Sequence, residues 1–147
     1  MRFVVGPVSE FAPGERRIVQ AGVRSIGVFR IGDRFYGIRN RCPHQGGPLC
    51  TGHLLDDAVA DEPGKASLTK NPVRVACPWH GWEYDLETGQ SFIGAGAPGV
   101  RSYGVTTAPG ATLLEELQAE PSELRPGPYT AETFEVKVED EFVVLHV

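Results

Sequence analysis

Apolar and polar residues alternate along several short segments of this chain, a pattern that is typical of half-buried β-strands. Residues 25–31 and 34–38 carry β-branched and aromatic side chains on either side of Gly32-Asp33, which is a two-residue turn signal. They predict a hairpin, and residues 16–20 predict a short strand before it. Residues 7–14 predict a loop with at most one helical turn.

The same alternation returns in the second half of the chain. Residues 73–76 and 82–86 predict two further strands, and a turn at 87–89 would lead into a returning strand at 90–93. The alternating segments 133–138 and 142–147 predict a closing hairpin.

Two segments lack this pattern. Residues 54–71 are polar and predict a surface loop, and residues 94–110 are rich in Gly, Pro and Ala. Residues 111–120 have the composition of a short helix. The chain is therefore predicted to be a single all-β domain over 1–147, built of short antiparallel strands with loop insertions at about 54–71 and 95–131.

Composition and charge argue against some classes of function. The chain has 147 residues and a net charge of −5, which argues against nucleic acid as a partner. An acidic surface suits docking to a basic patch on a partner protein, although it is equally compatible with having no specific partner. No apolar run approaches the length of a membrane helix, and no signal peptide is recognisable, so we expect a cytoplasmic protein that does not enter a membrane.

The candidate chemistry lies in two short Cys–His patterns, each after a predicted strand. One is Cys42-Pro43-His44, and the other runs from Cys77 to His80. Two thiolates suit one iron and two imidazoles suit the other iron of an asymmetric 2Fe–2S cluster. From the residues alone zinc is the alternative, although zinc sites usually pair Cys with Cys and His with His in each local hook.

The sequences CPHQGGPL at 42–49 and CPWHGWEYDLETG at 77–89 resemble the two boxes of the Rieske 2Fe–2S family. They are most similar to the ferredoxins and oxygenase N-terminal domains of ring-hydroxylating systems. The resemblance implies a three-sheet antiparallel β-sandwich with both ligand loops at one tip and the imidazoles near the surface. It also implies one Rieske-type 2Fe–2S cluster, with four ligands: Cys42, His44, Cys77 and His80.

The resemblance further implies a set of residues around the cluster. Tyr84 occupies the place of a hydroxyl donor to the cluster sulfurs in respiratory members, whereas Trp82 stands where those members have a serine. With one of the two hydroxyls missing, we expect a low-potential cluster. The other expected neighbours are Gln45, Gly46, Trp79 and Pro98, the last in a loop that covers the cluster.

The sequence also departs from the family pattern. The boxes are further apart than in compact members, and residues 94–131 exceed the usual short connection. The second box lacks the additional cysteine of respiratory members, so their disulfide is absent and Cys50 is expected to be a free, buried thiol.

We expect an electron carrier rather than an enzyme. A terminal oxygenase needs a second iron on two histidines and a carboxylate, but only His53 and His146 remain, far apart in sequence. The predicted partners are a reductase that donates the electron and a terminal oxygenase that accepts it. The alternative is a fixed Rieske subunit of a larger redox complex, similar to a nitrite reductase small subunit or associated with an oxygenase. A third possibility, a redox sensor, is supported by no feature of the sequence.

Overall fold

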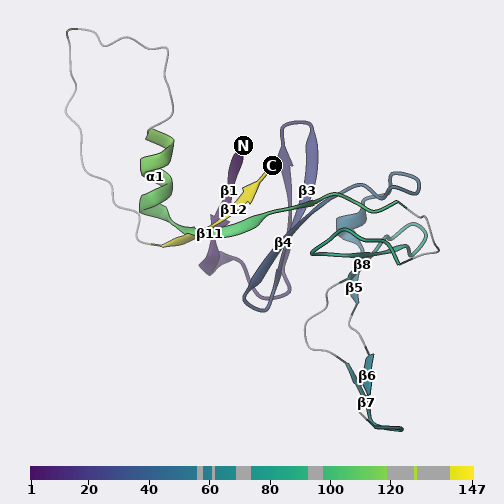
Figure 1. Cartoon of the computed structure of the whole chain (residues 1–147). Coiled ribbons are helices and arrows are strands. Elements are labelled where there is room, and N and C mark those ends of the chain that lie inside the picture. The colour runs from purple at the N-terminus through teal and green to yellow at the C-terminus, as the bar shows by residue number, and fades with distance from the viewer. Residues whose placement is uncertain (56–57, 61, 69–73, 93–97, 119–127, 129–139) are drawn as a thin grey trace.

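The chain forms three antiparallel β-sheets and a separate two-stranded hairpin in the computed structural model (Figure 1). This confirms the predicted all-β architecture of three sheets. The structure describes residues 1–55, 58–60, 62–68, 74–92, 98–118, 128 and 140–147.

The central sheet has the strand order β10-β4-β3-β2. The predicted hairpin is confirmed as β3 (Arg24–Ile31) paired with β4 (Arg34–Arg39), and Gly32 turns the chain with a φ of +60° that favours glycine. The short strand predicted at 16–20 is confirmed as β2 (Arg16–Ala21), which pairs with the other edge of β3. The short strand β10 (Ser102–Tyr103) pairs with β4 and was not predicted.

The second sheet joins the two ends of the chain in the order β1-β12-β11. Strand β12 (Glu141–His146) lies between β1 (Arg2–Pro7) and β11 (Val105–Pro109), which pair with it on both edges. The predicted hairpin of 133–138 with 142–147 is therefore wrong, because β12 has no free edge for it. Residues 133–138 themselves lie outside the described part of the chain.

The third sheet contains β5 (His53–Leu55), β8 (Arg74–Ala76) and β9 (Glu83–Asp85). The prediction of β8 and β9 is confirmed. The predicted returning strand at 90–93 is reduced to one bridge between Tyr84 and Ser91.

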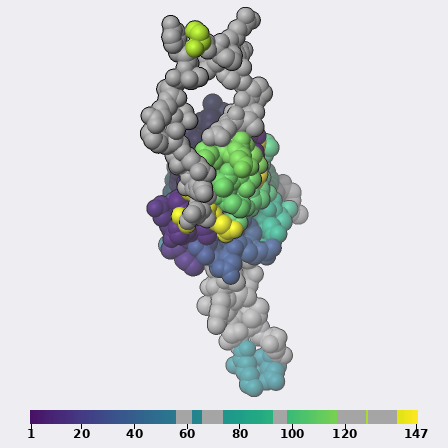
Figure 2. All heavy atoms as spheres, turned by 90° about the vertical axis from the view of Figure 1, so that its left-hand side faces the viewer, coloured from purple at the N-terminus to yellow at the C-terminus, as the bar shows by residue number. Residues whose placement is uncertain are grey.

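The predicted surface loop at 54–71 is wrong in part. It contains the end of β5 and a hairpin of β6 (Ala58–Ala60) with β7 (Ala66–Leu68), which projects from the body of the molecule in both views (Figures 1 and 2). The Gly-rich segment 94–110 is also more ordered than a loop, because it supplies β10 and β11. Strands β10 and β11 form by backbone pairing with β4 and β12, which are distant in sequence, whereas β6 and β7 pair with each other in a local hairpin.

Two apolar clusters flank the central sheet because successive side chains of β3 point to opposite faces. Ile26 and Val28 belong to a cluster shared with β12, whereas Phe29 and Ile31 belong to a cluster shared with the third sheet. The second of these clusters also contains Cys42 and Cys77, so the candidate ligand loops stand directly on packed core.

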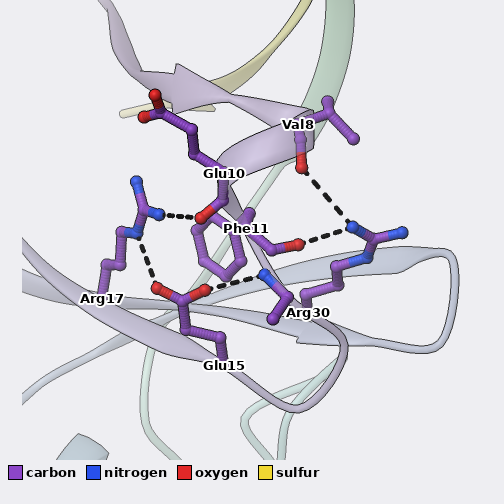
Figure 3. Close-up of polar contacts among 7 residues, drawn as sticks. Val8, Glu10, Phe11, Glu15, Arg17 and Arg30 are labelled. Carbon is purple, nitrogen blue, oxygen red and sulfur yellow. Dashed lines mark hydrogen bonds and ion pairs between the residues drawn. The ribbon is translucent and has the colours of Figure 1, made fainter.

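The predicted helical turn near the N-terminus is confirmed as a 3₁₀ turn at Val8–Glu10, and Arg17 of β2 and Arg30 of β3 fix it to the central sheet (Figure 3). Arg30 donates to the carbonyl of Phe11 at 2.5 Å, and Arg17 donates to the carbonyl of Glu10. The Glu15 carboxylate accepts from the Ala12 amide and from Arg17, and these two donors lower its pKa. The turn thereby closes over the buried ring of Phe11.

The predicted helix at 111–120 is confirmed as α1 (Gly110–Gln118), which lies on the outside of the molecule (Figure 2). Its Glu116 pairs with Arg2 of β1 at 2.5 Å. Within the described residues, the structure contains no helix with the length and apolar character needed to span a membrane.

Candidate metal centre

The two candidate ligand loops have the same backbone hydrogen-bond pattern. In the loop after β4, the Cys42 amide donates to the carbonyl of Gly47, and the Gly46 amide donates to the carbonyl of Cys42, both at 2.8 Å. In the loop after β8, the Cys77 amide donates to the Trp82 carbonyl at 2.8 Å, and the Gly81 amide donates to Cys77 at 2.9 Å.

Each loop closes on a glycine at the fourth position after its cysteine. The φ angles of Gly46 and Gly81 are +79° and +73°, a region in which side chains with a Cβ are strained. The Gly46 of the sequence prediction is therefore a turn residue of the first loop. Gly81 has the matching role in the second loop, and its place after His80 is the sequence signal for it.

The loops bring the four predicted ligands together in two pairs. The imidazoles of His44 and His80 are both exposed, and their ring centroids lie 4.7 Å apart. The thiols of Cys42 and Cys77 form the second pair and are buried, with exposed fractions of 2% and 3%. The expectation that both histidines lie at the surface is confirmed.

Burial and local donors act in opposite directions on the second thiol. Burial raises the pKa of Cys77, while the backbone amides of Trp79 and His80 donate toward its sulfur and favour the thiolate. The neighbouring Cys42 thiol raises the pKa of Cys77 further, which is the expected result of bringing two such groups together. A cation placed between the thiols would remove this repulsion.

The donor set fits two unlike irons better than one ion. Among the described residues, no three His, Cys, Asp or Glu side chains converge as they would around a single metal ion. A sulfur pair and a nitrogen pair are instead the division of ligands that a Rieske centre requires.

Two aromatic residues after the second loop support the ligands. The Tyr84 hydroxyl is fully buried and lies 3.5 Å from the Cys42 sulfur, a contact in which either group can be the donor. Burial raises the pKa of Tyr84, which keeps its proton available for that contact. The half-buried Trp82 ring packs on the core and stacks on His44, with centroids 4.1 Å apart and planes 10° from parallel.

The remaining predicted neighbours of the cluster lie at the surface. Gln45 and Pro98 are exposed, and residues 94–97 of the predicted covering loop lie outside the described residues. Trp79 is 56% exposed at the rim of the second loop.

Gly47 of the first loop lies against the second loop, a contact that the sequence analysis did not identify. A Cβ on this residue would lie 2.9 Å from the Trp79 ring and 3.1 Å from the Cys77 sulfur. The absence of a side chain thus allows the two loops to approach. The paired glycines in CPHQGG are the sequence signal that could have revealed it.

The third cysteine is not a ligand in this arrangement. Cys50 is free and fully buried, as expected, and its sulfur contacts the carbonyl of Ile38 at 3.5 Å. Burial raises its pKa to about 12. A Cβ on Gly27 would lie 2.5 Å from this sulfur, so Cys50 fills the space beside β3.

The two other histidines lie elsewhere. His53 begins β5 and is exposed, which corrects its predicted place in a loop. His146 is at the end of β12, as predicted, and its ring hydrogen-bonds with the Thr106 hydroxyl at 2.7 Å.

A family model described as the Rieske [2Fe-2S] domain matches residues 1–104, which include both ligand loops and most of the three sheets. This chain belongs to the Rieske [2Fe-2S] family. Its cofactor is one Rieske-type 2Fe–2S cluster.

Similar proteins support this assignment for the Rieske chain. It is 28% identical over 121 residues to the 3-phenylpropionate/cinnamic acid dioxygenase ferredoxin subunit of Escherichia coli, a match that covers 82% of this chain and 98% of that protein. The fold is similar to the ferredoxin of carbazole 1,9a-dioxygenase from Nocardioides aromaticivorans, with a TM-score of 0.55 and 24% identity over 71% of this chain and 88% of that one. It is also similar to the terminal oxygenase of carbazole 1,9a-dioxygenase from Novosphingobium, with a TM-score of 0.57 and 16% identity over 99% of this chain and 29% of that one.

Proposed function

We propose that this chain is a cytoplasmic Rieske ferredoxin that takes one electron from a reductase and passes it to a terminal oxygenase. The observation that carries the proposal is the pair of exposed imidazoles together with the pair of buried thiols. The near full-length match to a dioxygenase ferredoxin subunit supports the assignment to such a system. In this proposal the electron carrier has no catalytic site of its own.

We further propose Cys42 and Cys77 as the ligands of one iron, and His44 and His80 as the ligands of the other. A bound Rieske cluster supplies reversible one-electron chemistry. The buried cysteines hold its negatively charged side within the core, and the exposed histidines bring its other side to the surface where a partner can approach.

The proposed low potential rests on the number of side-chain donors near the thiols, since each donor to sulfur raises the potential. The amides of Trp79 and His80 and the Tyr84 hydroxyl all favour negative charge on sulfur. At the position of the serine of high-potential members, Trp82 offers stacking on His44 instead of a hydroxyl. One side-chain donor rather than two favours the lower end of the Rieske range.

We also propose that residues 1–147 act as one domain. The pairing of β1 with β12 joins the first and last strands in one sheet. Strands β11 and β12, which follow the matched segment 1–104, complete that sheet rather than form a unit of their own.

The test is electron paramagnetic resonance of the purified, dithionite-reduced chain. A Rieske cluster gives a lower average g value than an all-cysteine 2Fe–2S cluster, and we expect that signal in the unmodified chain. His80→Ala should lose it, because one imidazole ligand is removed, whereas His53→Ala should keep it, because His53 is an exposed residue outside the loops.

Two results would contradict the proposal. A chain that carries zinc and gives no signal would exclude the cluster function. A chain that is recovered only within a tight enzyme complex, and that does not accelerate cytochrome c reduction by a supplied reductase, would favour the fixed subunit over the mobile carrier.

A further inference from the structure

A hollow of about 500 Å³ lies on the flank of the first ligand loop. Its walls come from residues 41–46 of that loop, from residues 99–101 and from Arg39 at the end of β4. No residue of the second ligand loop contributes to it. It shares Cys42 and His44 with the cluster site and therefore adjoins the proposed point of electron exit.

Three arginines line this hollow: Arg39, Arg41 and Arg101. No acidic residue is among its lining residues. Arg41 and Arg101 are exposed, and Arg39 is half-buried. The Arg101 guanidinium lies over the Tyr103 ring, 5.2 Å from its centroid, and the Arg41 side chain lies against Gly46 of the ligand loop.

These three arginines lack the carboxylate partner that four other arginines have. Arg2, Arg17, Arg30 and Arg74 each form an ion pair with a carboxylate. Within the described residues, Arg39, Arg41 and Arg101 have no such ion pair. Arg16, Arg24 and Arg34 also form no ion pair within the described residues, but they lie outside the hollow. In a chain with a net charge of −5, positive charge is thus concentrated next to one exposed cluster histidine.

We propose that this hollow, with its three arginines, docks a carboxylate-bearing patch of the redox partner protein and thereby places that partner against His44. Guanidinium groups bind carboxylates through paired hydrogen bonds, and complementary charge at a docking face raises the rate of productive encounter. The inference rests on the proposed electron-carrier function. It reverses the expectation from net charge, because the face used for transfer is basic although the chain is acidic.

The test measures electron transfer from the reduced chain to acceptors of different charge by stopped-flow spectroscopy. Cytochrome b5 supplies a haem edge surrounded by carboxylates, cytochrome c supplies a basic one, and a small uncharged quinone supplies a reference without docking. Arg41→Glu should slow transfer to cytochrome b5 relative to the quinone by about ten- to twenty-five-fold, because the reversal changes the local charge by two units and each unit is worth about three- to fivefold at close range in water. The same variant should accelerate transfer to cytochrome c.

Two matched variants isolate the charge at the hollow. Arg41→Lys keeps the charge but loses the paired hydrogen bonds of the guanidinium, so it should slow transfer to cytochrome b5 less than Arg41→Glu does. Arg34→Glu makes the same charge reversal at the opposite end of β4, on an exposed residue outside the hollow, and should change neither rate. High salt should abolish the difference between Arg41→Glu and the unmodified chain, because exposed charges are then screened.

The outcomes separate this inference from the function on which it rests. If Arg41→Glu and Arg101→Glu both leave the cytochrome b5 rate unchanged while the quinone reference is normal, the docking site is wrong and the carrier function stands. If the reduced chain transfers no electron even to the quinone, the carrier function itself fails.

Discussion

At the scale of single residues, the centre depends on a few side chains whose place follows from short-range sequence. Cys42, His44, Cys77 and His80 are predictable as candidate ligands from their residue types, their spacing and the family resemblance, because both loops are local structures closed by their own backbone hydrogen bonds. Gly47 was missed because its role is a contact across the loops. The paired glycines in CPHQGG indicate a close approach at this position, but they do not say which segment approaches.

The first prediction concerns the buried hydroxyl beside a ligand. Tyr84→Phe should lower the reduction potential by roughly 20–60 mV, because one net hydrogen bond that favours the more negative reduced state is lost. The measurement is a redox titration followed by visible absorption or circular dichroism.

A second tyrosine gives a matched control for this change. Tyr103 is also buried, and its hydroxyl has no hydrogen-bond partner within the described residues. Tyr103→Phe should therefore leave the potential unchanged. An equal shift in both variants would mean that the Tyr84 hydroxyl does not act through Cys42.

At the scale of elements, the two ligand loops are coupled by the close approach of a short 3₁₀ turn, Leu49–Thr51, to strand β8. The turn follows the first loop, and β8 leads into the second. Arg16 donates to the carbonyls of Cys50 and Gly52 and holds the turn in place. Gly52 itself lies against the Ala76 carbonyl, where a Cβ would be only 1.7 Å from the oxygen.

Gly52→Ala should therefore move β8 and the second ligand loop. The obstructing atom is backbone, so no side-chain rotation can relieve the clash, and we expect a loss of stability of about 3 kcal/mol together with lower cluster content. Denaturant unfolding and iron analysis measure the two effects. Gly104→Ala, where the nearest atom would be 3.9 Å from the new Cβ, should change neither, and an equally mild effect of Gly52→Ala would contradict the coupling.

The elements also show where sequence reasoning succeeds and fails. The hairpin of β3 and β4 was predictable because its alternation and its Gly32-Asp33 turn are local. The hairpin expected at 133–147 was wrong because β12 pairs instead with strands distant in sequence, which no local pattern encodes. Strand β10 is too short to produce an alternating pattern and depends on its backbone pairing with β4.

At the scale of the whole molecule, the last strand completes the fold begun by the first. Val143, Val144 and Leu145 of β12 are all at most 1% exposed. Each buried aliphatic side chain contributes about 2 kcal/mol, so together they approach the net stability of about 5–15 kcal/mol that is usual for a domain.

A chain shortened to residues 1–104 should therefore fail to fold cooperatively, although it contains the whole matched family segment. Circular dichroism during thermal unfolding and cluster content measure the result. Replacing residues 58–68 with a short Gly-Ser linker is the control, since β6 and β7 pair with each other and project from the body (Figure 1). A stable, cluster-bearing 1–104 fragment would show that β12 is dispensable.

The shared backbone design of the two ligand loops has a consequence for the biosynthesis of the holoprotein. In each loop, backbone hydrogen bonds of the cysteine amide and the cysteine carbonyl hold the turn, together with a glycine of positive φ. None of these groups is a metal ligand. Both ligand loops can therefore fold with the rest of the chain, before the cluster is present. Maturation then becomes the insertion of a preassembled cofactor into a finished protein, with little conformational entropy left to lose at that step.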